Sequence, residues 1–205
     1  MIHHYGSGLN ALPLLQQFRQ TPADIYLLRV GYGGITGPMS NIRQDGSVYN
    51  AFHSWPDTLE GDAYSGDYGP NFLAIMLGSA TYVVEDPELG GLVAYGGNMA
   101  VNGNNTVTVQ PRDPVRQRVY IAPLGLYITM SAGQIQEFDY SPTTSEVVLK
   151  LVQDSPPSAN TTIVWVETPG TTDHYQVINK GLQEVRLGWE VELSSSPTEV
   201  TVSKV

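Results

Sequence analysis

The sequence predicts a mainly β protein: an antiparallel β-sandwich with a short helical segment at the N-terminus. From about residue 72 onward, about a dozen short apolar and β-branched runs alternate with turn residues. The chain of 205 residues is also rich in glycine (21) and proline (14), which favours many short strands joined by turns. One run, EVVLKLV, has period two, so Val147, Leu149 and Leu151 are expected on a buried face.

The first part of the chain has helical signals. Apolar residues recur at helical spacing in NALPLLQQFRQ, and TPADIYLLRVG follows directly. In this second stretch Thr21 suits the N-cap position, and Gly31 is expected to end the helix. The sequence therefore predicts a short pair of helices.

A change of pattern after these helices marks the predicted domain organisation. GYGGITGP supplies four glycines and a proline in eight residues, which predicts a loop. We expect a short helical segment over residues 1–30 and a β-sandwich domain over residues 31–205, with long loops at 31–71.

The charge of the chain excludes several classes of partner. Twenty acidic residues oppose ten basic ones, giving a formal net charge of −10. Nucleic acids and anionic membrane surfaces are bound through clusters of lysine and arginine, so neither is expected as a partner. The chain has no cysteine, which removes disulfides and thiolate chemistry.

One stretch, AFHSWPDTLEGDAYSGDYGPNF (Ala51–Phe72), combines five aromatic residues, one histidine and four carboxylates without any lysine or arginine. Aromatic rings stack on the C–H face of a sugar, and neighbouring acids and amides bond its hydroxyl groups. The opposing interpretation is that the aromatics anchor the loop in the core and the carboxylates cap turns. The residues expected to bind a sugar are His53, Trp55, Asp57, Tyr64, Asp67, Tyr68 and Asn71.

The same stretch contains candidates for hydrolysis. A glycosidase needs two carboxyl groups about 5 to 9.5 Å apart across the scissile bond. The catalytic candidates are Asp57, Glu60, Asp62 and Asp67, and the sequence does not decide which pair would act.

No cofactor and no metal site are expected. The carboxylates of DTLEGDAYSGD could hold Ca²⁺, but their spacing differs from that of an EF-hand, so calcium is the minor alternative. His3 and His4 are adjacent and would point to different sides of a regular element.

Two long stretches resemble a known group of proteins. The first stretch begins with LLRVGYGGITGPMSNIRQDG, contains SWPDTLE and SGDYGPNF, and ends with LGGLVAYGGN. The second stretch is RVYIAPLGLYITMSAGQIQEFDY. They are similar to the C-terminal part of large, poorly characterised fungal and bacterial proteins that look like glycoside hydrolases, with a helical toroid joined to β-sandwich domains. The resemblance covers about Tyr5 to Leu151.

The resemblance implies that this chain is the C-terminal portion of a longer protein. The first helices would be the closing helices of the toroid, the missing N-terminal region of the parent protein would be a partner, and the loops from Asp45 to Asn71 would face its sugar cleft. The resemblance assigns no catalytic residue. The chain itself begins without a signal peptide, and an extracellular location is expected for the parent protein.

The sequence thus leaves three functions open. The first is a carbohydrate-binding β-sandwich domain that recognises a poly- or oligosaccharide through the aromatic and acidic loop. The second is a glycan hydrolase or lyase, or a fragment of one, that uses a carboxylate pair of the same loop. The third is a structural docking module of a larger enzyme.

Overall fold

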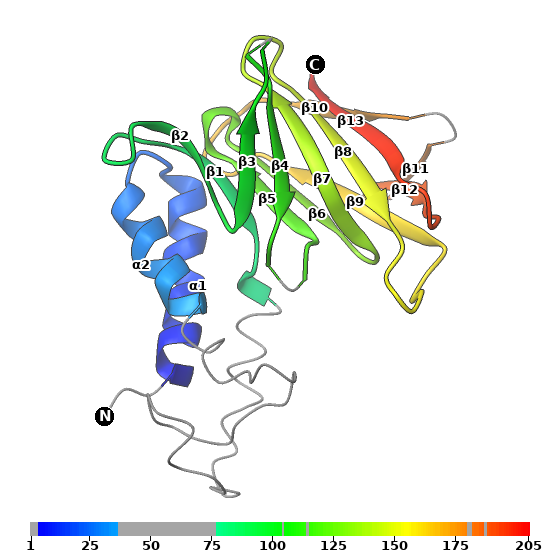
Figure 1. The fold of residues 1–205 in the computed structure, drawn as a ribbon. Helices are drawn as coiled ribbons and strands as arrows, with labels where there is room; N and C mark the ends of the chain where they lie inside the picture. Colours follow the sequence, from blue (N-terminus) through cyan, green and yellow to red (C-terminus); the bar gives the residue numbers. More distant parts are fainter. Residues whose placement is uncertain (1–3, 37–76, 104, 114, 180–181, 187) are drawn as a thin grey trace, which may run out of the picture. The chain divides into compact units, whose positions relative to one another are not determined.

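The computed structural model describes residues 4–36, 77–103, 105–113, 115–179, 182–186 and 188–205. They belong to two compact units, Met1–Ser79 and Ala80–Val205, and each unit is described by itself. Among the described residues the first unit holds two helices and the second holds 13 strands (Figure 1). The prediction of a mainly β protein with a short helical N-terminus is confirmed. Neither helix combines the length and apolar character that crossing a membrane requires.

The helical unit consists of α1 (His4–Gln20) and α2 (Ile25–Thr36), which contact each other. One set of their apolar residues recurs at helical spacing and is buried, which confirms the predicted pair of helices. The buried apolar residues are Ala11, Leu15, Phe18, Leu28 and Ile35.

The predicted start of the second helix is wrong, because Thr21 belongs to the end of α1. Its hydroxyl and its backbone N–H both donate to the carbonyl of Gln17, each at 3.0 Å. Thr21 therefore satisfies a carbonyl group at the C-terminal end of α1. The second helix begins only after Asp24, at Ile25.

The predicted end of that helix is also wrong, because α2 continues through GYGGIT to Thr36. A Cβ atom on Gly31 would lie 2.9 Å from both Cγ and Cδ2 of Leu15. The glycine thus lets α2 approach α1 closely instead of ending the helix. Packing of the two helices offsets the low helix propensity of glycine. Residues 37–71 of the predicted loop lie outside the described residues.

The sandwich unit contains a seven-stranded sheet in the order β11-β12-β9-β6-β5-β1-β2. Strand β1 runs parallel to β5, and the other neighbours are antiparallel. The strands are β1 (Thr81–Asp86), β2 (Gly91–Tyr95), β5 (Arg118–Ile121), β6 (Leu126–Met130), β9 (Thr161–Glu167), β11 (Gln183–Val185) and β12 (Gly188–Glu192).

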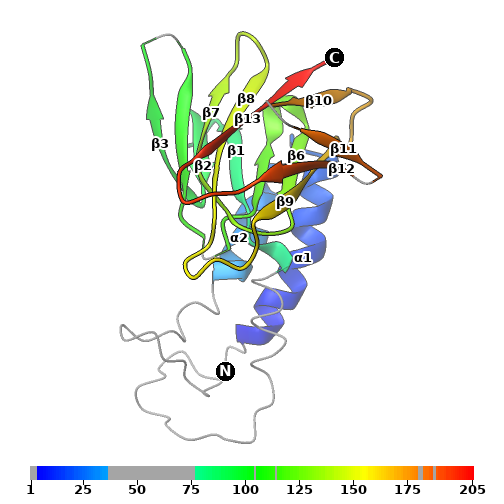
Figure 2. The same ribbon diagram turned by 90° about the vertical axis from the view of Figure 1, so that its right-hand side faces the viewer.

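A six-stranded antiparallel sheet has the order β10-β13-β8-β7-β4-β3 and lies across the first sheet (Figures 1 and 2). Its strands are β3 (Gly97–Val101), β4 (Val107–Pro111), β7 (Gln134–Ser141), β8 (Glu146–Val152), β10 (Tyr175–Ile178) and β13 (Thr198–Lys204).

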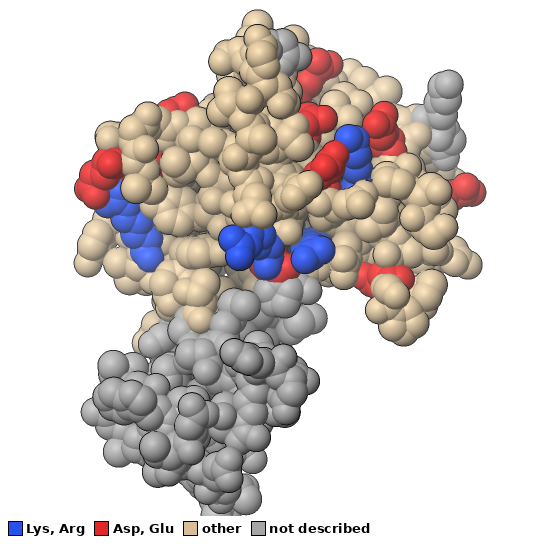
Figure 3. Space-filling view, in the orientation of Figure 1, with Lys and Arg blue, Asp and Glu red and all other residues tan. Residues whose placement is uncertain are grey.

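The hydrophobic core lies between the two sheets. Val164 of the seven-stranded sheet and Phe138 of the six-stranded sheet belong to one buried cluster. The predicted period of EVVLKLV is confirmed, since Val147, Leu149 and Leu151 are buried in that cluster. The outer face of the six-stranded sheet is polar, and Figure 3 shows acidic and basic side chains interspersed on it.

The apolar run GLVAYGG contains parts of two strands. Strands β2 and β3 are separated by Gly96, whose φ is +81°. At this glycine the chain leaves the seven-stranded sheet and enters the six-stranded sheet.

Candidate functional site

The nine residues that the sequence predicts as binding or catalytic lie outside the described residues. These are His53, Trp55, Asp57, Glu60, Asp62, Tyr64, Asp67, Tyr68 and Asn71. Their roles stay predictions. The described residues contain a different candidate site.

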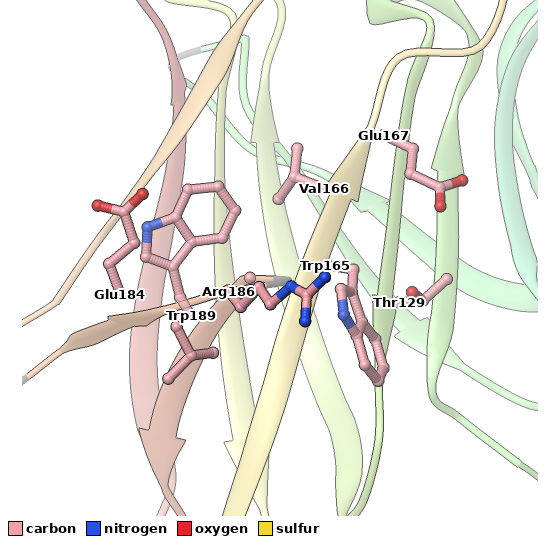
Figure 4. A pocket seen from close by; sticks show the side chains of 9 residues that line it. Thr129, Trp165, Val166, Glu167, Glu184, Arg186 and Trp189 are labelled. Atoms are coloured by element: carbon pink, nitrogen blue, oxygen red, sulfur yellow. The ribbon is translucent and has the colours of Figure 1, made fainter.

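A hollow of about 540 Å³ lies in the sandwich unit at the β11–β12 end of the seven-stranded sheet (Figure 4). Strands β6, β9, β11 and β12 and the turn between β11 and β12 contribute to its lining. The lining residues are Thr129, Trp165, Val166, Glu167, Glu184, Val185, Arg186, Gly188 and Trp189.

The hollow arises from a step in the pairing of the strands. Strand β12 pairs with β9 as far as Trp189 opposite Val164. On its other side, β9 pairs with β6 as far as Glu167 opposite Tyr127. Strand β9 therefore extends beyond its pairing with β12, and the hollow lies at this step.

Trp165 projects from the face of the sheet opposite the core. Its neighbour Val164 is buried in the core, and successive side chains of a strand point to opposite faces. One residue beyond the last pair of the β9–β12 register, Gly188 lies opposite Trp165. A Cβ atom on Gly188 would lie 3.2 Å from Cδ1 of Trp165 and 2.4 Å from the carbonyl oxygen of Val164. The glycine thus provides the space that the indole ring needs beside β12.

Trp189 forms another wall of the hollow and is anchored differently. It lies opposite Val164 in the register and packs against the core cluster, where it is partly buried. Glu184 lies opposite Trp189 across the β11–β12 pair. Since Trp165 and Trp189 belong to different faces of the sheet, the hollow extends around the end of the β11–β12 hairpin.

The charged groups of the hollow have no partner within the protein as described. Across the described residues, the side chains of Glu167, Glu184 and Arg186 make neither a hydrogen bond nor an ion pair, and all three are exposed. Arg186 lines the hollow together with both tryptophans, and in the view of Figure 4 its guanidinium group projects between them. The carboxylates of Glu167 and Glu184 lie farther out on either side. The hollow therefore presents aromatic surface together with donors and acceptors that solvent or a ligand can occupy.

Next to the hollow, the face opposite the core continues as a row of tyrosines. Tyr82, Tyr120 and Tyr127 lie on neighbouring strands β1, β5 and β6, and their rings meet edge to face at centroid distances of 6.1 and 6.4 Å. All three are buried. Tyr127 lies opposite Glu167, a lining residue of the hollow, so the row borders this side of the hollow.

Away from the hollow, the buried acid Asp113 holds a turn in the connection from β4 to β5. Its Oδ1 accepts hydrogen bonds from the backbone N–H of Val115 (3.0 Å) and of Arg116 (2.6 Å), and Arg116 has a φ of +52°. Its Oδ2 has no hydrogen-bond partner among the described residues. Burial raises the pKa of Asp113 above its ordinary value of 3.8, against the opposing effect of the two N–H groups and of nearby Arg116 and Arg118.

The described residues contain no group of three or more metal-ligating side chains that could hold an ion. The expectation about calcium concerned residues outside the described part, so it stays untested.

The patterns of TIVWVE and WEVEL are typical of strands and do not by themselves indicate a hollow. A signal was present: two of the three tryptophans of the chain fall in these strands. Period two places Glu167 on the same face as Trp165. The tight turn at Arg186 also places Glu184 opposite Trp189 in the β11–β12 pair. What the sequence did not contain was the pairing of β9 with β12.

The fold and the hollow define a two-sheet β-sandwich protein with an aromatic surface site. A family model matches residues 1–201, and the chain belongs to that family, the family of unknown function DUF5695. No curated protein matches the chain, and no solved structure matches it.

Proposed function

We propose that this chain binds a poly- or oligosaccharide, and that the hollow around Trp165 is a binding site for it. The observation that supports the proposal is that two tryptophans line one hollow together with unpaired carboxylates and one unpaired guanidinium. An indole ring offers a flat surface for the C–H face of a pyranose, and the charged groups can bond its hydroxyls.

The proposal extends the expectation from sequence without depending on the same residues. The aromatic and acidic stretch Ala51–Phe72 remains a candidate for a further part of the glycan-binding surface. We further propose that the chain is related to glycoside-hydrolase-like proteins with a helical toroid. We also propose that its parent protein is extracellular.

Binding rather than hydrolysis is proposed. Hydrolysis requires a defined pair of carboxyl groups on either side of the scissile bond. The residues expected to form that pair, Asp57, Glu60, Asp62 and Asp67, lie outside the described residues. The hollow supports recognition of a glycan independently of them.

The experiment is a glycan array with the full 205-residue chain and with Trp165→Ala. We expect the substitution to weaken binding about tenfold or more, the scale of one lost aromatic contact. Because Trp165 projects away from the core, its removal should change the melting temperature little. Tyr26→Ala is the matched control, since Tyr26 is an aromatic residue of the helical unit that is 70 % exposed.

Two further results would decide against the proposal. One is an array on which the folded chain binds no glycan. The other is a bound glycan whose affinity is the same for Trp165→Ala and for the wild type. Trp55→Ala, measured alongside, separates a contribution of the Ala51–Phe72 stretch from that of the hollow.

A further inference from the structure

The guanidinium group of Arg186 has no partner among the described residues, unlike several other cations of this sandwich. Lys150 pairs with Glu137 at 2.6 Å, and Lys204 pairs with Asp173 at 2.8 Å. Arg112 donates to Oδ1 of Asn98 at 3.3 Å. Arg186 makes no such contact with any described residue, although two glutamates line the same hollow and acids outnumber bases by 20 to 10.

The position of Arg186 in the hollow explains what its guanidinium group can do. It lines the same hollow as Trp165 and Trp189, and in the view of Figure 4 it projects between their rings. A guanidinium group has a planar fork of donors that matches the two oxygens of a carboxylate. A sugar that stacks on Trp165 would bring its ring substituents to this fork.

We infer that the sugar residue bound in the hollow carries a carboxylate, so that the ligand class is an acidic glycan containing a uronic acid. This inference rests on the proposed function and makes it more specific. The uronate carboxylate accepts two hydrogen bonds from Arg186 while the pyranose ring lies on Trp165. A neutral sugar would leave this cation to water.

The two glutamates of the hollow restrict where the glycan can carry further negative charges. Glu167 and Glu184 lie on either side of Arg186 with their carboxylates farther out. They accept hydrogen bonds from hydroxyl groups and repel a second uronate next to the first. The favoured ligand therefore has a uronate flanked by neutral sugars, and a polymer of uronates alone is disfavoured.

The test uses a hyaluronan hexasaccharide, in which uronate and neutral sugar alternate, and the same hexasaccharide after reduction of its carboxyl groups. An oligogalacturonate hexamer, cellohexaose and a glucosamine hexamer complete the series. Binding to the full chain is measured by calorimetry at low and at physiological salt. We expect the alternating ligand to bind roughly ten- to hundredfold more tightly than its reduced form, the scale of a charge-assisted hydrogen-bonded pair. Added salt should reduce this preference.

Variants assign the preference to Arg186. Arg186→Gln should remove the difference between the acidic ligand and its reduced form, and Arg186→Lys should restore only part of it, because an ammonium group lacks the fork. Arg112→Gln removes the same charge from an exposed arginine outside the hollow and should leave the preference intact. A melting curve of each variant confirms that it is folded.

The outcomes separate this inference from the proposed function. Equal affinity for the acidic ligand and its reduced form, with both lost in Trp165→Ala, would overturn the uronate and keep the glycan site. Tighter binding of the glucosamine hexamer would also overturn it, whereas tighter binding of oligogalacturonate would overturn the pattern of a uronate flanked by neutral sugars. Absence of binding to every glycan would contradict the proposed function itself.

Discussion

Gly188 is the residue on which the geometry of the hollow depends most directly. Its missing side chain leaves room for the indole of Trp165 and for the carbonyl oxygen of Val164. A backbone oxygen cannot rotate away as a flexible side chain would, so an added methyl group must push β12 away from β9.

We therefore predict that Gly188→Ala lowers the free energy of unfolding by about 1–3 kcal/mol, as overpacking usually does. It should weaken glycan binding as well, because Trp165 is displaced. Denaturant unfolding measures the first effect and calorimetry the second. Gly103→Ala is the control, since a Cβ atom there meets nothing within 4 Å. A Gly188→Ala variant with wild-type stability and affinity would show that the close approach is unimportant.

Asp113 allows a prediction about pH. Its pKa is raised in the folded protein, so folding favours the protonated carboxyl group. The stability that this group contributes is fully present below pH about 3.8 and is lost as the pH rises through the raised pKa. Asp113→Asn keeps an oxygen for the N–H groups of Val115 and Arg116 but carries no charge.

The stability of Asp113→Asn relative to the wild type should therefore increase between pH 4 and pH 7, as measured by urea unfolding at several pH values. Glu192→Gln removes one charge from an exposed side chain and serves as the control for the change in net charge. A difference between Asp113→Asn and the wild type that stays constant over this range would contradict the account.

At the scale of elements, an ion pair connects strands β7 and β8 on the outer face of the six-stranded sheet. Nζ of Lys150 lies 2.6 Å from Oε1 of Glu137, and the two side chains are 29 % and 23 % exposed. The hydrogen bond from Lys150, followed by one from Gln110, lowers the pKa of Glu137 below its ordinary value of 4.5. The pair therefore stabilises the fold above pH about 4.5, and this contribution is lost as the pH falls through the lowered pKa.

A double-mutant cycle with Glu137→Gln and Lys150→Met should give a coupling energy of about 0.5–1 kcal/mol at pH 7, the upper range for pairs near the surface. The same cycle at Asp173 and Lys204, whose side chains are more exposed, should give a smaller value. Equal coupling in both cycles, or coupling at Glu137 and Lys150 that does not decrease as the pH falls below about 4.5, would refute this assignment.

The elements also show which sequence signals were decisive. Period two identified β8 correctly, because one face of that strand is core and the other is solvent. Signals for helix ends misled at Thr21 and Gly31: the first caps the preceding helix, and the second allows close packing with Leu15. Thr21 can cap either of the two helices, and Gly31 can either end α2 or allow close packing. Only the packing of α1 against α2 decides between these alternatives.

At the scale of the whole molecule, the fold class could be predicted and the candidate site could not. Turn spacing and strand patterns are local, so they predicted a mainly β sandwich with a helical N-terminus. The hollow depends on β9 and β12, which are separated in sequence by β10 and β11 and meet only through the sheet order. The same limit explains why Trp165 and Trp189 were not recognised as neighbours.

The central proposal is that an aromatic hollow at the β11–β12 end of the seven-stranded sheet binds a glycan. The most direct test is a calorimetric titration of the wild type and of Trp165→Ala, both confirmed as folded, with a glycan that the array identifies. The account predicts a dissociation constant about tenfold or more higher for Trp165→Ala, with a nearly unchanged melting temperature. Equal dissociation constants for the two proteins would contradict it and would place any glycan site elsewhere in the chain.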